Sequence, residues 1–326
     1  MVLAGLSTVT GPRLSILVLH RVLPQADALF PAELDAARFD RLMAVAARSF
    51  QVLRLSDAVR HLQQGTLPAR ALCITFDDGY ADNHDIALPI LKRHGLPACF
   101  FIATGFLDGG RMFNDTVIEC LRLSPLSHID LGEFGLGRFD LNTAAQRAEV
   151  IGRLMPVIKF RSTQERAPML DRLRQLCQAN GLPDDLMMTR SQVQAMHAAG
   201  MEIGAHTVHH PILCKVTDEV AEQEIAQSRA VLQGLTDHPV SLFAYPNGRP
   251  GRDYALQHVS MVKRLGFAAA VSTSPGVSSP GDDRHQLPRF TPWESNPRVW
   301  MSRMVGNRRR HQFETAKVAS TGVSLA

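Results

Sequence analysis

Short, continuous apolar segments recur along this chain and constrain its fold more than any other feature. Segments that are apolar at every position are typical of strands buried on both faces, as in parallel sheets. Amphipathic helical patterns such as DAARFDRLMAVAARSF separate them. Alternating strands and helices predict a (β/α) barrel or an open parallel sheet. The predicted strands lie in the segments LSILVLH, ALCITFDDG, ACFFIATG, MEIGAHT, VSLFAYPNG and FAAAVSTS.

One section interrupts this alternation. Residues from about 108 to 185 contain amphipathic helical stretches but no convincing core strand, so we predict a mostly helical insertion within one domain that spans 1–302. A single domain fits the length of 326 residues, because α/β barrels of this size fold as one unit. Residues 303–326 carry the basic run RRRH and then small residues with little apolar surface to bury. This composition indicates a flexible tail that is available to contact anionic lipid or saccharide.

The composition argues against several classes of function. The net charge of +4 is small, and no stripe of alternating basic and aromatic residues is present, so we expect no nucleic-acid partner. No run reaches about 18 apolar residues, which predicts no transmembrane segment but leaves peripheral membrane contact open. The five cysteines form no CxxC pair, and the N-terminus lacks an early basic region, which together predict reduced thiols in a cytoplasmic protein. The oligomeric state stays open.

Two adjacent carboxylates, Asp77 and Asp78, follow the apolar run ALCITF. Adjacent like charges repel in a cleft, so the two groups need different tasks. A divalent metal would provide them, because it takes one carboxylate as a ligand and leaves the other to move protons. The alternative is that the sequence DDG only marks a tight turn.

Three histidines follow the apolar run MEIGA, in the sequence HTVHH. His206 and His210 are four positions apart, a spacing that brings two imidazoles to one face of a helical turn, and the pair His206 and His209 also qualifies by spacing. Two imidazoles and a carboxylate suit Zn²⁺, Co²⁺, Ni²⁺ or Fe²⁺ and leave positions for water and a substrate oxygen. Any one of these histidines, taken alone, is better explained as a surface or core residue, but three within five residues at a strand end weaken that explanation.

The pairing of TFDDGY with HTVHH about 130 residues later resembles the two metal motifs of the polysaccharide deacetylase family, the NodB-homology domain of carbohydrate esterase family 4. The resemblance covers residues 14–105 and 186–293. It implies a distorted (β/α) barrel of about seven parallel strands. It also implies that Asp77 is the general base, that Asp78, His206 and His210 bind the metal, and that His209 is a bystander.

Two further motifs depart from the common pattern of that family. The segment FAYPNG, at 243–248, is similar to the third motif, which implies that the backbone N–H of Tyr245 stabilises the oxyanion. The arginine that usually begins this motif and braces the base is missing. Arg289, in LPRFTPW, is a candidate replacement, and a structural or surface ion pair is the alternative interpretation.

The usual C-terminal histidine motif, which carries the general acid, is also missing. His20, in LVLHRVLP, ends a predicted strand at the opposite terminus and lies next to the cationic Arg21. This arrangement resembles a permuted subgroup that includes biofilm poly-N-acetylglucosamine deacetylases, and it implies that His20 is the acid. A core or capping histidine is the alternative.

The resemblance implies a metal-dependent hydrolase that removes the N-acetyl group of an amino sugar and releases acetate. The expected substrate is an N-acetylated poly- or oligosaccharide, or a lipid-linked precursor. Zn²⁺ is the expected metal, with Co²⁺, Ni²⁺ or Fe²⁺ as alternatives. Two other readings remain open: a NodB-like amidohydrolase acting on a non-saccharide amide, such as the metal-free hydrolases of cyclic ureides, and a catalytically silent saccharide-binding domain.

Overall fold

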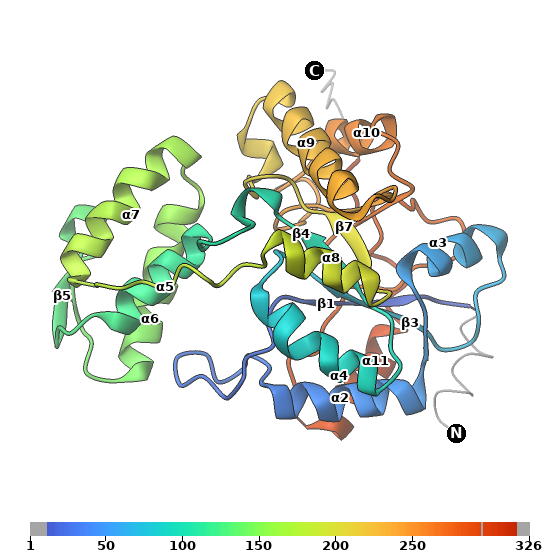
Figure 1. Ribbon diagram of the computed structural model, residues 1–326, viewed down its shortest axis with the longest axis horizontal. Helices are drawn as coiled ribbons and strands as arrows, with labels where there is room; N and C mark the ends of the chain where they lie inside the picture. Colours follow the sequence, from blue (N-terminus) through green and yellow to red (C-terminus); the bar gives the residue numbers. More distant parts are fainter. Residues whose placement is uncertain (1–11, 295, 318–326) are drawn as a thin grey trace, which may run out of the picture.

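A parallel sheet of seven strands forms the centre of the protein in this computed structural model, which describes residues 12–294 and 296–317 (Figure 1). The strand order is β1-β3-β4-β7-β8-β9, and the short β2 pairs with the start of β3. Every pairing in this sheet is parallel. The strands are β1 (Ser15–Leu19), β2 (Gln51–Val52), β3 (Ala71–Phe76), β4 (Cys99–Ile102), β7 (Glu202–Ala205), β8 (Leu242–Ala244) and β9 (Ala269–Val271).

The sheet curls, and an extended segment after β9 joins its two edges. On one side, the N–H of Leu287 donates to the carbonyl of Ala270 at 2.9 Å. On the other, the N–H of Phe290 donates to the carbonyl of Ile16 in β1, also at 2.9 Å. The predicted distorted (β/α) barrel of about seven parallel strands is therefore confirmed, with an irregular closing segment at residues 287–291.

Packing on both faces explains why the strand segments are continuously apolar. Along β3, Leu72, Ile74 and Phe76 point into the core that contains the surrounding helices. The intervening Ala71 and Cys73 point into a second core, which α3 shares. The helices around the sheet are α2 (Ala36–Ser49), α3 (Leu55–Gln64), α4 (Leu88–Arg93), α8 (Arg190–Ala198), α9 (Asp218–Thr236), α10 (Leu256–Arg264) and α11 (Pro297–Asn307).

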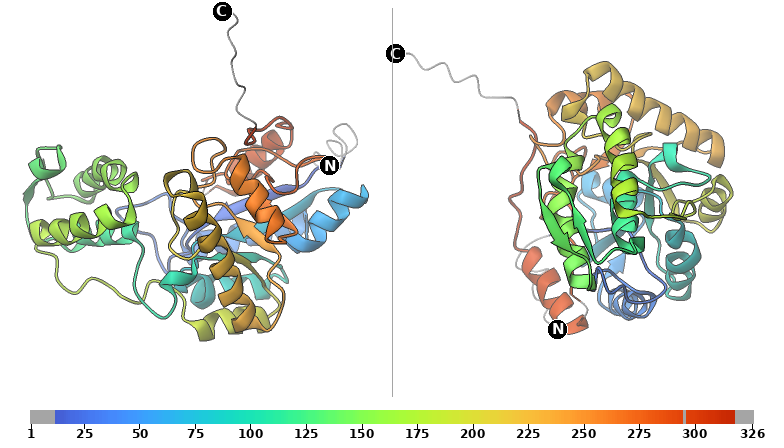
Figure 2. Two further views of the ribbon diagram at one scale, coloured as in Figure 1. Left: turned by 90° about the horizontal axis from the view of Figure 1, so that it is seen from above. Right: turned by 90° about the vertical axis from the view of Figure 1, so that its left-hand side faces the viewer.

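The section from 108 to 185 projects from one side of the barrel (Figures 1 and 2). It contains the helices α5 (Phe113–Leu123), α6 (Ala144–Lys159) and α7 (Thr163–Cys177), as its amphipathic pattern predicts. It also contains an antiparallel strand pair that we did not predict, β5 (His128–Asp130) with β6 (Arg138–Asp140). Buried side chains of these elements form a hydrophobic core separate from those of the barrel.

The C-terminal region differs from the sequence-based expectation. We expected a flexible tail from residue 303, but α11 continues to Asn307, and both Trp300 and Met304 are buried. These two residues are four apart and lie on one helix face. The ring of Trp300 packs edge-on against the ring of Phe50, with 6.2 Å between the ring centroids. Farther along, the N–H of Ala316 donates to Gln286 Oε1 at 2.6 Å. The expected tail is therefore wrong for 303–317, and 318–326 lie outside the described residues.

Within the described part of the chain, no helix combines the length and the apolar character that crossing a membrane requires.

Candidate active site

A cleft of about 900 Å³ lies at the carboxyl ends of the strands. The wall opposite the barrel comes from α5 and α6 of the insertion, through residues such as Phe113 and Lys159. Parallel α/β folds place their sites at this end of the strands, because the loops there converge. The cleft brings together six of the seven predicted site residues: His20, Asp77, Asp78, His206, His210 and Arg289.

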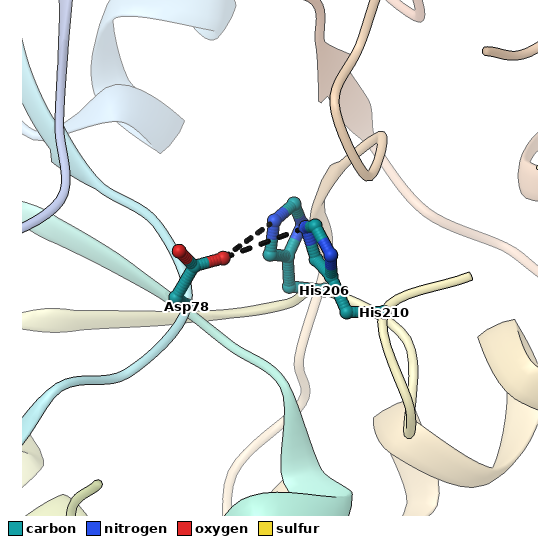
Figure 3. A group of neighbouring side chains, drawn as sticks. All are labelled: Asp78, His206 and His210. Carbon is teal, nitrogen blue, oxygen red and sulfur yellow. Dashed lines mark ion pairs between the residues drawn. The ribbon is translucent and has the colours of Figure 1, made fainter. Parts of the chain in front are cut away.

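Asp78, His206 and His210 converge on one point (Figure 3). The Nε2 atoms of His206 and His210 lie 3.5 Å and 3.4 Å from Asp78 Oδ1. One ligand atom from each residue falls within 4.8 Å of the others. The Nδ1 of His206 lies 2.7 Å from the carbonyl of Ala244, an acceptor that fixes the tautomer and leaves the Nε2 lone pair free.

The loops that carry these side chains hold unusual backbone conformations. Asp78, Thr207 and His210 have φ angles of 77°, 65° and 53°, in the left-handed region. Such residues persist only where their surroundings enforce them, and they cluster at functional sites. Thr207 is part of that support, because its Oγ1 accepts the N–H of His210 at 3.1 Å and donates to the carbonyl of His206 at 2.5 Å.

The charges of Asp78 and His210 suit a divalent cation. Burial lowers the pKa of His210 to about 3, so its imidazole is neutral at physiological pH. Burial alone would raise the pKa of Asp78, but its interactions with His206 and His210 hold that pKa well below its usual range. One ionised carboxylate and imidazole nitrogens in a buried site match the donors that Zn²⁺ and similar ions prefer.

Asp77 is paired with Arg289. The Nη1 and Nη2 atoms of Arg289 lie 2.6 Å from the two carboxylate oxygens of Asp77, and the arginine Nε donates to the carbonyl of Ser272 at 2.9 Å. Burial alone would raise the pKa of Asp77, but the charge of Arg289 outweighs it, and the pKa lies below its usual value. Arg289 is 1% exposed, which rules out a surface ion pair. It therefore occupies the bracing position suggested by the sequence.

His20 follows β1 and lines the same cleft. Its carbonyl accepts a hydrogen bond from Asn83 Nδ2 at 2.8 Å, which fixes its backbone. The neighbouring Arg21 is turned to another partner, since its Nε lies 2.8 Å from Asp82 Oδ2. His20 thus shares the cleft with Asp77 and Asp78, and the guanidinium of Arg21 pairs with Asp82 instead.

The expected oxyanion role of Tyr245 is wrong in this structure. The N–H of Tyr245 donates to the carbonyl of Val271 at 3.2 Å, as part of the pairing between β8 and β9, and the residue is fully buried. Asn247, two positions later, lines the cleft and has a φ of 59°. The described residues provide no hydrogen-bond acceptor for its N–H, whereas its carbonyl accepts from Thr273 Oγ1 at 2.6 Å. The Asn-Gly pair of FAYPNG, a tight-turn signature, could have pointed to Asn247.

His209 takes no part in the convergence. Its Nδ1 lies 2.7 Å from Glu224 Oε1, and its imidazole is exposed. Glu224 Oε2 also accepts the N–H groups of Val208 and His209, at 2.8 Å and 2.7 Å. Glu224 therefore anchors the loop between the two metal-site histidines, a role that its place within a helical pattern did not reveal.

Comparison with known sequences identifies relatives of this chain. Residues 64–122 and 162–270 match the polysaccharide deacetylase family model. The YxkH protein of Bacillus subtilis is 21% identical over 241 residues, which cover 74% of this chain and 58% of YxkH. The poly-beta-1,6-N-acetyl-D-glucosamine N-deacetylase of Staphylococcus epidermidis is 26% identical over 96 residues, 29% of this chain and 33% of that enzyme. The chain thus spans less than two thirds of these relatives.

Comparison with solved structures finds the same fold. The deacetylase PplD of Streptococcus pyogenes, solved with acetate, has a TM-score of 0.58 at 19% identity, with 91% of this chain and 98% of that one covered. IcaB of Ammonifex degensii has a TM-score of 0.60 at 17% identity, with 91% and 97% covered. The matched sequence regions contain Asp77, Asp78, His206 and His210. The chain belongs to the polysaccharide deacetylase family.

Proposed function

We propose that this protein hydrolyses the N-acetyl amide of an amino sugar in a poly- or oligosaccharide, or in a lipid-linked precursor, and releases acetate with the help of a divalent metal. One observation carries the proposal: the Asp78, His206 and His210 cluster shares a cleft with the Asp77 and Arg289 pair and with His20. The names of the staphylococcal relatives, poly-beta-1,6-N-acetyl-D-glucosamine N-deacetylases, support this choice of substrate class.

Asp78 Oδ1, His206 Nε2 and His210 Nε2 are the atoms that would hold the metal, with Zn²⁺ as the first choice and Co²⁺, Ni²⁺ or Fe²⁺ as alternatives. When bound, such an ion polarises a carbonyl oxygen and lowers the pKa of water to about 7.

The remaining residues have separate tasks in this proposal. Asp77 is ionised and held by Arg289, and a carboxylate oxygen keeps a lone pair beside each guanidinium hydrogen bond, so Asp77 accepts the proton of the attacking water. His20 donates a proton to the departing amine nitrogen. The N–H of Asn247, for which the described residues provide no acceptor, donates to the oxygen that becomes negative in the tetrahedral intermediate.

The test is an assay of purified protein for metal content and for acetate release from β-1,6- and β-1,4-linked N-acetylglucosamine oligomers. We expect acetate release that stops with a chelator and returns with Zn²⁺. Release that persists in metal-free protein would contradict the metal assignment. No release from any saccharide by metal-loaded protein would favour the non-saccharide or silent alternatives.

A further inference from the structure

Positive charge gathers on one side of the proposed saccharide cleft. Lys159 lies at the end of α6, and Arg249 and Arg252 lie on the loop after β8, so the insertion and the barrel both contribute. The guanidinium of Arg252 lies over the ring of Phe160, 5.1 Å from its centroid, which shows that these two walls meet. The cations therefore form a wall between the barrel and the insertion, which we call the cationic wall, defined by Lys159, Arg249 and Arg252.

The same positive region continues into a smaller recess. This recess, of about 40 Å³, shares Lys159, His210 and Asn247 with the main cleft, so it lies beside the proposed metal site. It adds Arg161, Arg166 and Lys215. Among the described residues that line it, none is acidic. Arg161 lies 3.7 Å from Glu165, a carboxylate outside the recess lining.

The acidic residues of the main cleft do not neutralise the cationic wall. Asp77 is matched by Arg289, and Asp78 belongs to the metal site. Asp253 is the remaining acid among the described lining residues. Its Oδ2 accepts the backbone N–H of Arg249 at 3.0 Å, and its Oδ1 lies 3.9 Å from Arg252 Nε. The wall thus has three cations and one nearby carboxylate, whose only side-chain ion pair among the described residues is with Arg252, and the described residues give the side chains of Lys159 and Arg249 no ion pair.

The cations of the wall lie close enough to repel one another. Burial lowers the pKa of Lys159, Asp253 partly opposes this, and the charges of Arg252 and Arg249 lower the pKa further. A neutral N-acetylated sugar chain has no charge with which to offset this repulsion, although its rings could stack on exposed aromatics such as Phe160 and Trp293. A ligand with negative charge would relieve the repulsion and gain charge-assisted hydrogen bonds.

From this imbalance we infer that the substrate carries an anionic group, a carboxylate or a phosphate, which binds the cationic wall next to the sugar whose amide is cleaved. The inference rests on the proposed deacetylation and narrows its substrate class to anionic saccharides. Negative charge on the substrate would select among N-acetylated sugars that present the same amide to the metal site.

Calorimetric binding to the metal-loaded protein tests the inference with matched ligands. One pair is N-acetylglucosamine and its 1-phosphate; the other is tetra-N-acetylchitotetraose and a tetrasaccharide of alternating glucuronate and N-acetylglucosamine. We expect the anionic member of at least one pair to bind about tenfold more tightly, which corresponds to about 1.4 kcal/mol. Preference for the phosphate alone indicates a phosphorylated substrate, and preference for the uronate alone indicates an acidic polysaccharide. Equal binding within both pairs overturns the inference.

Variants distinguish the contribution of the cationic wall to anion affinity from that of the metal, which also attracts anions. K159Q/R249Q leaves Asp78, His206 and His210 intact and should reduce the ratio of anionic to neutral affinity by about tenfold. R41Q/R153Q removes two exposed cations from α2 and α6 outside the cleft and should leave that ratio unchanged within about twofold. An unchanged ratio in K159Q/R249Q assigns the preference to the metal alone and overturns the inference.

An acetate-release assay on the same ligands keeps this inference distinct from the proposed function. If no ligand loses acetate while the binding ratio still depends on Lys159 and Arg249, the deacetylase proposal fails and the anion site stands. If acetate is released but neutral and anionic substrates have equal kcat/KM in wild type and in K159Q/R249Q, the anion site fails and the deacetylase proposal stands.

Discussion

Arg289 donates a hydrogen bond to each carboxylate oxygen of Asp77 at 2.6 Å, although the two residues are 212 positions apart in the sequence. The pair is buried, and the arginine is further held by the carbonyl of Ser272 and by Thr75 Oγ1. A carboxylate in such surroundings stays ionised only because the guanidinium offsets its burial. The arginine that supports the proposed base thus comes from the closing segment of the barrel.

Replacing Arg289 with methionine should raise the pKa of Asp77, because burial then acts without a counter-charge. The acidic limb of the pH profile of kcat/KM should move to higher pH, and the rate at neutral pH should fall by about 100-fold. Arg289→Lys should restore part of the rate by returning the charge without the bidentate geometry. The shift is measured by acetate release from pH 5 to 9. A pH profile identical to wild type would show that Arg289 does not support the base.

A measurement of metal content should distinguish variants of the proposed metal ligands from a variant of the proposed base. Asp78→Ala and His206→Ala each remove one of three converging ligand atoms, so the purified variants should lose the metal. Asp77→Asn should keep the metal and lose turnover. His209→Ala is the matched control, because His209 contacts Glu224 instead and the variant should keep its metal. Metal loss in His209→Ala but not in His206→Ala would reverse the assignment.

His20→Ala should fold, bind metal and release acetate from a saccharide amide about 100 to 10,000 times more slowly. The defect should largely disappear with 4-nitrophenyl acetate, whose leaving group needs no proton. Comparison of the two substrates in the variant and wild type measures this contrast. An equal loss on both substrates would indicate that His20 has a structural or substrate-positioning role instead.

Substitutions at Asn247 test the revised oxyanion assignment. Its φ of 59° is accessible to glycine but strained for β-branched residues. Asn247→Gly keeps the N–H in place and should retain kcat within about threefold, whereas Asn247→Val should lower kcat by about 100-fold as the turn distorts. Circular dichroism and metal content serve as controls for folding. Full activity in Asn247→Val would remove this N–H from the mechanism.

Asp115, on α5, gives a prediction about stability and pH. Burial raises its pKa to about 6, and its oxygens accept the Met112 N–H and the Tyr80 hydroxyl. The folded state therefore binds this proton more tightly than the unfolded chain, and the wild type should lose stability as pH rises from about 4 to 6. Asp115→Asn keeps a hydrogen-bond acceptor that does not titrate, so this variant should avoid the loss in the free energy of unfolding, which is on the order of 3 kcal/mol in the wild type. Denaturant unfolding at pH 4 and pH 8 measures the difference, and a constant difference between variant and wild type would contradict it.

Local sequence predicted the features that depend on neighbouring residues. The apolar strand segments predicted the barrel. The adjacent Asp77 and Asp78 form one short motif at a strand end, and His206 and His210, four positions apart, form another. The role of Tyr245 could not be judged locally, because the partner of its N–H, Val271, lies on a different strand. Long-range pairing decides which backbone groups stay free.

The C-terminal region was misjudged for a related reason. Trp300 and Met304 are sparse apolar residues in a basic segment, and their burial depends on a surface near Phe50, far away in the sequence. The composition of the segment alone gave no sign of that surface. Likewise, the helical pattern of the insertion predicted α5, α6 and α7, but not that α5 and α6 would form a wall of the cleft.

The closing segment at residues 287–291 is a point of low local stability that affects both the barrel and the proposed base. It is irregular, its edge at β1 is held by one backbone hydrogen bond and by the hydroxyl of Thr291 rather than by a full strand ladder, and it carries Arg289. Local unfolding of this segment would separate Arg289 from Asp77 while the rest of the sheet stayed intact. Heat or mild denaturant would then abolish catalytic activity before the whole protein unfolds.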